Sequence, residues 1–380
     1  MSNNKSFFLS PQAAAIYKHR LLKSYIPVWV GKVGSTSQGK RVILYDAYSG
    51  PGRYEDDQPG SPEILVDTAV AMAQLRSVHT VFSEKDAKYC ARLRQMLEDK
   101  QVDPRTYDVL PGPIEQHIDS VLASAGELPL FVFLDPYGLT VSFDRVVHIL
   151  KAREVRGRSA RLQPRTELLL NFSYEAIRRI SGVAKSDKEY RAKDAQLEAL
   201  DSALGGAWWR QLAVDEAQGW VNQILLGYAR RIAAAAGYGG FITVAVADSL
   251  EAEPVYELIL FTRHPDGLWE MSEAMSFARR DWRQWLVDKR ELAMGGQGQL
   301  RGLDFDDNED AWVLEIADNI ERLLGAADVL VIQERLGEVM GRTLGLAREK
   351  HIRSALKRLN GQGVVGEVPT GRLQRATVRR

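Results

Sequence analysis

Residues 42–52 have the sequence VILYDAYSGPG, from which the class of fold can be inferred. Four apolar residues in a row, Val42 to Tyr45, predict a strand buried on both faces, as strands of parallel sheets are. Asp46 ends the strand, and Gly50 and Gly52 allow a sharp turn that a ligand can approach without meeting a Cβ. In an α/β sheet, nucleotide-like ligands bind at this end of a strand.

Strands and helices alternate on both sides of this stretch. The expected strands cover residues 80–83, 107–110, 130–134 and 166–172, and a late antiparallel pair covers 244–246 and 256–261. The expected helices cover residues 9–30, 62–75, 87–99 and 114–123, with a helical insertion over 174–235. This alternation predicts an α/β fold with βαβ units and a mostly parallel, doubly wound sheet.

The turn after the first strand has the pattern Asp-x-x-x-Gly-x-Gly. It is neither the three-glycine dinucleotide pattern nor a phosphate-binding loop with Gly-Lys-Ser/Thr. It is the S-adenosylmethionine variant, in which the cofactor has no phosphates and the acidic residue helps to hold its cationic methionine part. The residues that we expect to bind this cofactor in the turn are Asp46, Tyr48, Ser49, Gly50, Pro51 and Gly52. The alternative is a glycine turn with a purely structural role.

Two further positions fit the same cofactor. Glu84 closes the second strand, where a carboxylate can accept hydrogen bonds from both ribose hydroxyls. Gly112 follows the third strand, where bare backbone can lie against the adenine ring. The alternatives are an exposed charge at a strand end for Glu84 and an ordinary Pro-Gly turn for Gly112.

Asp135, Pro136 and Tyr137 follow the most apolar strand of the chain, and we expect them to be catalytic. An oxygen of Asp135 and the carbonyl of Pro136 would accept hydrogen bonds from a target amino group, while the ring of Tyr137 would stack on a base. Flipped bases are held by the same stacking and edge hydrogen bonding. The alternative is a capped loop turn. Residues 171–174 follow the next strand and are candidates to line the same pocket.

The C-terminal segment differs from the rest in charge. From Gly341 onward, ten residues are basic and two are acidic, a net charge of +8. Predicted helices over 312–324, 329–340 and 347–359, with a hairpin of 364–368 and 374–378, indicate a winged helix. The residues expected to bind nucleic acid are Arg348, Lys350, Arg353, Lys357, Arg358, Arg372 and Arg375. The alternative is a solvated basic face on a module that binds protein.

A linker candidate, Gly295-Gly296-Gln297-Gly298, separates the two parts. It divides the chain into a domain of residues 1–300 and a C-terminal domain of residues 310–380.

Residues 46–56 with Gly60-Ser61-Pro62, Glu84-Lys85-Asp86 and residues 133–138 (FLDPYG) resemble the three-Cys-motif partner protein (TcmP) family over nearly the whole chain. Members are regarded as methyltransferase-like and are encoded beside a partner protein with a three-cysteine motif. The resemblance implies a Rossmann-like class I methyltransferase sheet and a winged helix. It also implies that Asp46, Gly50, Gly52 and Glu84 bind cofactor and that residues 135–137 face the substrate. Amino-methyltransferases usually have two prolines before the aromatic residue, and this chain has one.

Composition narrows the function further. Lysine and arginine together number 50, as do aspartate and glutamate, and the single cysteine, Cys90, excludes an internal disulfide framework. The six histidines form no metal-ligand pair, so we expect no metal site. No run of 18 apolar residues and no leader is present, so we expect a cytoplasmic protein without membrane spans. The leading hypothesis is a methyltransferase acting on an amino group of a nucleic acid base. The alternative is a non-catalytic regulator on the same fold that binds DNA or a partner.

Overall fold

The computed structural model describes residues 12–154, 165–185, 193–215, 218–249, 252–293 and 309–380. The chain forms two compact units. The first consists of the residues up to Ala15 together with Ile26–Arg263, and the second consists of Ile16–Tyr25 with His264–Arg380. Helix α1 (Ala13–Ser35) therefore contributes residues to both units.

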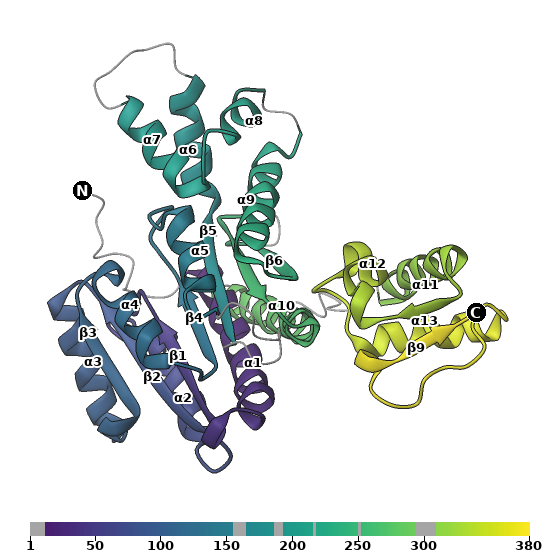
Figure 1. Cartoon of the computed structure of the whole chain (residues 1–380), viewed down its shortest axis with the longest axis horizontal. Helices are drawn as coiled ribbons and strands as arrows, with labels where there is room; N and C mark the ends of the chain where they lie inside the picture. The colour runs from purple at the N-terminus through teal and green to yellow at the C-terminus, as the bar shows by residue number, and fades with distance from the viewer. Residues whose placement is uncertain (1–11, 155–164, 186–192, 216–217, 250–251, 294–308) are drawn as a thin grey trace. The chain divides into compact units, whose positions relative to one another are not determined.

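The first unit is built on a seven-stranded sheet. Its strands are β1 (Arg41–Asp46), β2 (Ser77–Glu84), β3 (Tyr107–Pro111), β4 (Leu130–Leu134), β5 (Thr166–Ser173), β6 (Gly240–Val246) and β7 (Tyr256–Thr262). Their order across the sheet is β3-β2-β1-β4-β5-β7-β6, and Figure 1 labels β3, β2, β1, β4 and β5 in this order. The first five strands are parallel, and β7 runs antiparallel to both β5 and β6. The predicted α/β fold with a late antiparallel pair is confirmed.

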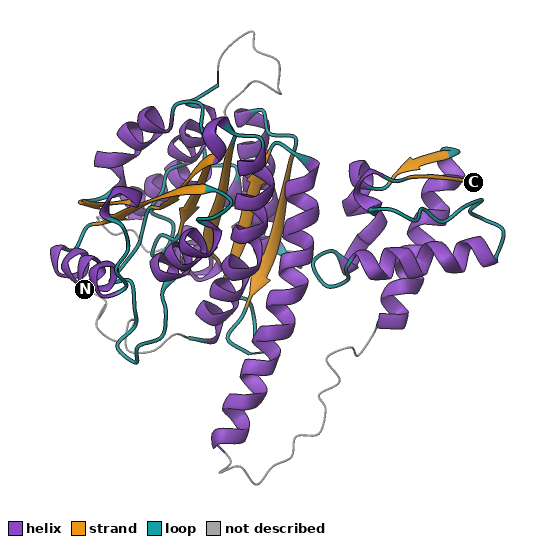
Figure 2. Ribbon diagram, turned by 90° about the horizontal axis from the view of Figure 1, so that it is seen from below, coloured by secondary structure: helices purple, strands orange, loops and turns teal. Residues whose placement is uncertain are grey.

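Helices lie on both faces of this sheet (Figure 2). Between the parallel strands come α2 (Ser61–Met72), α3 (Ala87–Asp99), α4 (Ile114–Ala125) and α5 (Phe143–Lys151). The predicted helical insertion is present as α6 (Tyr174–Lys185), α7 (Lys193–Leu204), α8 (Trp209–Asp215) and α9 (Trp220–Ala236). Helix α5 was not among the expected elements.

The apolar run of β1 is explained by burial on both faces. Side chains alternate along a strand, so neighbouring residues point to opposite faces. Val42 and Leu44 are fully buried, while Ile43 and Tyr45 pack in a core cluster with Ile118 of α4. The strand is therefore fixed from both sides up to Asp46, where the turn begins.

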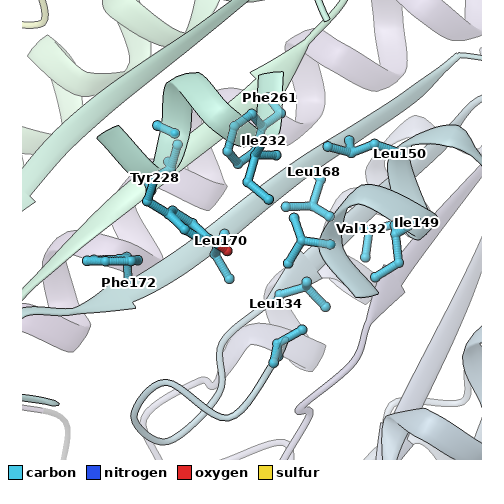
Figure 3. Packing of buried hydrophobic residues seen from close by; sticks show 14 of the residues in the cluster. Val132, Leu134, Ile149, Leu150, Leu168, Leu170, Phe172, Tyr228, Ile232 and Phe261 are labelled. Carbon is cyan, nitrogen blue, oxygen red and sulfur yellow. The ribbon is translucent and has the colours of Figure 1, made fainter. Parts of the chain in front are cut away.

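The same core fixes the ends of β4 and β5. Leu134 of β4 and Leu170 and Phe172 of β5 pack in one cluster with Tyr228 and Ile232 of α9 (Figure 3). Burying a side chain of this size contributes about 1.5–3 kcal/mol relative to leaving it exposed. The packed core therefore holds in place the residues that directly follow these strands.

The second unit contains α10 (Pro265–Ala293), α11 (Glu309–Ala326), β8 (Val329–Val331), α12 (Leu336–Met340), α13 (Glu349–Gly361) and β9 (Thr377–Arg379). Its core includes Ile316, Ile320, Leu330, Leu356 and Val378. Strand β9 pairs antiparallel with β8.

Two predictions for this unit were wrong. Residues 364–368 form no strand, and β9 pairs with β8 instead, because Leu330 and Val378 face each other and are both buried. The helix predicted over 329–340 starts with that strand, and only Leu336–Met340 is α-helical in it. The β-branched residues Val329 and Val331 favour this extended start.

Helix α10 belongs by its contacts to the second unit. Ser276 Oγ donates to the carbonyl of Leu346 at 2.6 Å, and Gly345 N donates to Ser272 Oγ at 3.1 Å. The chain therefore divides after Arg263 rather than at the boundary expected near residue 300, and the predicted linker at 295–298 lies outside the described residues. Within the described parts of the chain, no helix is both long and apolar enough to cross a membrane.

Candidate functional site

Four candidate residues lie at or near the carboxyl ends of neighbouring strands, at one edge of the sheet. Asp46 of β1 is in register with Phe82 of β2 and Phe133 of β4. Glu84 is the last residue of β2, and Asp135 directly follows β4. Because Leu134 of β4 is in register with Leu170 of β5, the next residue of β5, Asn171, lies beside Asp135. The carboxyl ends of the parallel strands thus bring together polar groups that lie up to 125 residues apart in sequence.

The turn after β1 is held by its own polar groups. Asp46 is fully buried, and its Oδ1 accepts a hydrogen bond from Tyr48 N at 3.2 Å. Ser49 Oγ donates to the carbonyl of Asp46 at 2.9 Å, and Ser49 N donates to the carbonyl of Ser83 at 3.1 Å. Gly50 and Gly52 have φ angles of 65° and 85°, which favour glycine. These bonds tie the turn to the end of β2.

Glu84 is fixed at this turn by two backbone groups. Its Oε2 accepts from Gly50 N at 2.9 Å and its Oε1 accepts from Asp86 N at 2.8 Å. A carboxylate offers about four acceptor positions, so each oxygen keeps capacity for a second donor. The carbonyl of Glu84 also accepts from Gly112 N at 2.8 Å. Hydrogen bonds therefore link the turn that begins at Asp46 to Glu84, and Glu84 to Gly112.

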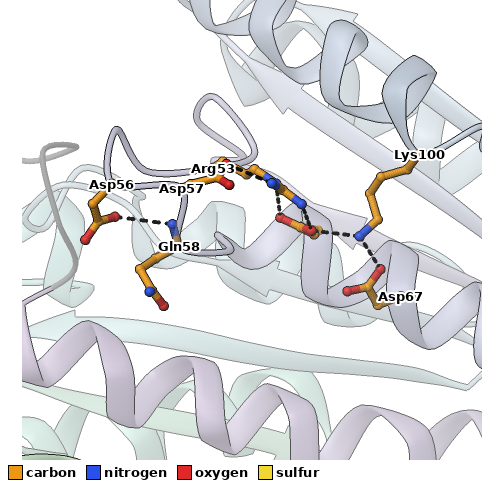
Figure 4. Close-up of polar contacts among 7 residues, drawn as sticks. Arg53, Asp56, Asp57, Gln58, Asp67 and Lys100 are labelled. Carbon is orange, nitrogen blue, oxygen red and sulfur yellow. Dashed lines mark hydrogen bonds and ion pairs between the residues drawn. The ribbon is translucent and has the colours of Figure 1, made fainter.

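The loop that follows Gly52 is fastened to α2 and α3 by an ion-pair network (Figure 4). Arg53 Nε donates to Glu63 Oε2 at 2.6 Å, and Lys100 Nζ lies 2.7 Å from both Glu63 and Asp67. Burial alone would raise the pKa of Glu63, but the hydrogen bonds from Arg53 and Lys100 hold it below its usual range. Much of the Gly-Arg-Tyr-Glu-Asp…Gly-Ser-Pro stretch thus has a structural role.

Gly52 and Gly60 are closely packed in this loop, and the φ of 85° at Gly52 also favours glycine. A Cβ on Gly52 would lie 2.8 Å from Met96 Cε of α3, and a Cβ on Gly60 would lie 2.7 Å from the carbonyl oxygen of Gly52. Gly60 N in turn donates to that carbonyl at 2.9 Å. The space beside Gly52 is therefore filled by α3. Of the two glycines in the turn, Gly50 is the one that contacts Glu84.

Asp135 is paired with an amide. Asn171 Nδ2 donates to Asp135 Oδ1 at 2.6 Å, and both residues are half-buried. Asn171 Oδ1 is buried and accepts no hydrogen bond from any described residue. Because buried acceptors are nearly always satisfied, this oxygen indicates a missing donor. Pro136 is buried, whereas the Tyr137 side chain is 68% exposed and presents a ring at the same edge.

Sequence reasoning missed Glu257, a buried carboxyl on β7. Glu257 is 4% exposed, is in register with Phe172 of β5, and accepts a hydrogen bond from Tyr174 Oη at 2.9 Å. Burial raises its pKa to about 7, against the opposing effect of hydrogen bonds from Thr243 and Tyr174. In sequence it is one glutamate among many, and only the pairing of β5 with β7 brings it to Tyr174.

Glu257→Gln is expected to flatten the dependence of stability on pH. The pKa of Glu257 is higher in the folded than in the unfolded chain, so the free energy of unfolding falls as pH rises from about 4.5 to about 7. The neutral amide removes that fall, which is worth on the order of 2 kcal/mol. Urea unfolding of the variant and the wild type at pH 5 and pH 8 measures it. The assignment would be contradicted if the free energy of unfolding changed equally with pH in the wild type and Glu257→Gln. It would also be contradicted if the exposed control Glu175→Gln reduced this pH dependence as much.

The predicted nucleic-acid-binding residues fall into two groups. Lys350 is ion-paired with Glu309, Arg353 donates to the carbonyls of Pro369 and Gly371 at 2.7 and 2.8 Å, and the Arg348 guanidinium lies 4.9 Å from the centre of the Phe277 ring. These three make contacts within the second unit. Lys357, Arg358, Arg372 and Arg375 are exposed, as is Lys350 beside its ion pair.

The sheet order, with five parallel strands and a reversed β7 inserted before β6, is that of the Rossmann-like class I methyltransferases. No family model matches the chain, and no curated protein matches it in sequence.

Solved structures that are similar to the chain include three methyltransferases. The METTL16 methyltransferase domain is 9% identical, with 63% of this chain and 66% of that chain covered and a TM-score of 0.30. The methyltransferase domain of bacterial CtHen1 is 10% identical, with 65% and 99% covered and a TM-score of 0.33. Magnesium protoporphyrin IX methyltransferase from Synechocystis PCC 6803, with bound SAH, is 12% identical, with 65% and 83% covered and a TM-score of 0.32. The fold class follows from the strand order itself.

Proposed function

We propose that the first unit is an S-adenosylmethionine-dependent methyltransferase that acts on an amino group, and that the target is a nucleic acid base. One observation supports this most directly. Glu84, bonded to Gly50, and Asp135, paired with Asn171, lie at the same edge of a class I methyltransferase sheet. The two carboxylates have different surroundings, which fits two different roles at one site.

The cofactor fits the residues of the turn. Glu84 is held by Gly50 N and Asp86 N while each oxygen keeps capacity for a ribose hydroxyl. Asp46, Tyr48, Ser49, Gly50, Pro51 and Gly52 form the turn, and Gly112 is bonded to Glu84. When bound, S-adenosylmethionine supplies an electrophilic methyl group on a sulfonium.

An amino target fits the Asp135–Asn171 pair. A primary amine on a base has two N–H donors, and Asp135, directly after β4, and Asn171 Oδ1, on the neighbouring β5, are acceptors. Accepting these hydrogen bonds keeps lone-pair density on the target nitrogen, and Asp135 can take the proton that leaves as the new N–C bond forms. The exposed ring of Tyr137 would stack on the base.

A nucleic acid target fits the second unit. We propose that α11, α12, α13 and the β8–β9 pair form a winged helix that recruits the substrate. The exposed side chains of Lys357, Arg358, Arg372 and Arg375 are available to phosphates.

Titration calorimetry with S-adenosylmethionine is expected to give saturable binding to the full chain. Transfer of a tritiated methyl group to DNA and tRNA is expected to label an exocyclic amine, identified by hydrolysis to nucleosides. No heat at millimolar cofactor would overturn the cofactor assignment. Cofactor binding without labelled nucleic acid would instead favour the non-catalytic regulator.

A further inference from the structure

A pocket lies within the second unit, between α10, α11 and the start of α13. Among the described residues, its lining contains four arginines and a single carboxylate. Cationic and planar side chains make up much of this lining, among them Arg279, Arg283, Phe277, Trp312, Arg348 and His351. All of them lie outside the candidate site of the first unit.

Two of these arginines have no ion pair with a carboxylate of the described residues. Arg279 and Arg283 are half-buried, and neither side chain has a hydrogen bond or ion pair with a described residue. Arg283 Nε is buried without a partner. They are four positions apart on α10, where like charges repel. Burial and the charge of Arg283 lower the pKa of Arg279, against a smaller opposing effect of Tyr17. Such an arrangement is unfavourable unless an anion joins it.

In the part of the chain that the structure describes, the carboxylates near the pocket already have partners. Glu309 is ion-paired with Lys350, and it lies 3.0 Å from Nε2 of His351. Glu273 accepts a hydrogen bond from Glu349 N, and Asp281 lies 3.9 Å from Arg280. Among the described residues, the positive charge that lacks a carboxylate partner therefore lies on Arg279 and Arg283.

Planar groups form much of the rest of the lining. The Arg348 guanidinium lies over the Phe277 ring, and the Trp312 ring packs edge-on with His351, 5.5 Å between centroids. His351 Nδ1 accepts from Arg348 N at 2.8 Å, which fixes the backbone at the start of α13. Flat aromatic and guanidinium surfaces beside paired arginines are typical of sites that hold a phosphate joined to a base.

We infer that Arg279 and Arg283 bind the phosphate of a nucleotide in this pocket. Guanidinium groups match phosphate oxygens through paired, charge-assisted hydrogen bonds. The phosphate can belong to a free nucleotide or to a nucleotide within a nucleic acid strand, since the chemistry is the same. Phosphate binding here does not depend on methyl transfer in the first unit.

The experiment is calorimetric titration of the full chain at low salt, where screening is weak. The probes are inorganic phosphate, adenosine 5′-monophosphate, a ten-nucleotide single strand and uncharged adenosine. The variants are Arg279→Gln and Arg283→Gln. The matched control is Arg322→Gln, an exposed arginine on α11 outside the pocket.

The expected result is saturable binding of at least one phosphate-bearing probe, weakened at least tenfold by each pocket variant and unchanged by Arg322→Gln. A tighter monophosphate identifies a free nucleotide, and a tighter single strand identifies nucleic acid. Both pocket variants are expected to melt no lower than the wild type without ligand, because no internal partner is lost. Failure of every phosphate probe, an equal effect of the control, or adenosine binding as tightly as its monophosphate would overturn the inference.

Discussion

Glu84→Gln is expected to weaken S-adenosylmethionine binding by on the order of 100-fold. In the proposed complex, both Glu84 oxygens accept ribose hydroxyls while they also accept from Gly50 N and Asp86 N. The side-chain amide of the variant presents one acceptor and one donor in place of two acceptors. One hydrogen bond to the ribose is therefore lost, and the backbone N–H that bonded to the same oxygen then faces a donor. Hydrogen bonds to charged groups contribute about 1.5–3 kcal/mol each, and 1.4 kcal/mol is a tenfold change in affinity.

Calorimetric titration of cofactor into wild type, Glu84→Gln and the control Glu98→Gln measures the effect. Glu98 is an exposed residue of α3, the helix that starts three residues after Glu84. The amide at position 84 can still accept from one backbone N–H, so the melting temperature serves to detect any loss of the turn. Wild-type affinity in a folded Glu84→Gln variant would rule out ribose binding by this residue.

The elements of the sheet were predictable because their signals are local. The run Val42 to Tyr45 is apolar throughout since both faces of β1 are buried. Helix α3 begins where it was expected because Asp86 caps it, its side chain accepting from Lys88 N. Glu84 could be placed near Gly50 from the rule that parallel strands share their carboxyl edge.

The errors and omissions arose from contacts between distant residues. Strand β9 was assigned to the nearest apolar stretch, but its partner β8 lies more than 40 residues upstream. Gly52 has the spacing of a ligand-binding glycine, yet its missing side chain makes room for Met96. The raised pKa of Glu257 depends on its burial, and the pairing of β7 with β5 places it beside Phe172, 85 residues away in sequence. Neither sequence spacing nor residue type reports such contacts.

Asp135→Asn is expected to lower the rate of methyl transfer by about 100-fold to 1,000-fold while cofactor affinity stays within threefold of wild type. The new amide can still accept from Asn171 Nδ2 through its oxygen, so the pair with Asn171 is kept. Its other group then becomes a donor, which opposes the N–H of the target and cannot take up its proton. Loss of a positioned proton acceptor typically costs about 10²- to 10⁴-fold in rate.

Single-turnover transfer of a tritiated methyl group, with saturating cofactor, separates this loss from binding. The control is Asp144→Asn, an exposed carboxylate on α5 in the same unit. Asn171→Leu is the complementary variant, since it removes the buried oxygen Asn171 Oδ1 and the anchor of Asp135 together. If Asp135 acts on the target amine, both site variants lose rate and neither loses cofactor. Transfer at the wild-type rate in Asp135→Asn would show that another group takes the proton of the amine. Weakened cofactor binding with an unchanged transfer rate would show that Asp135 binds the cofactor and not the target.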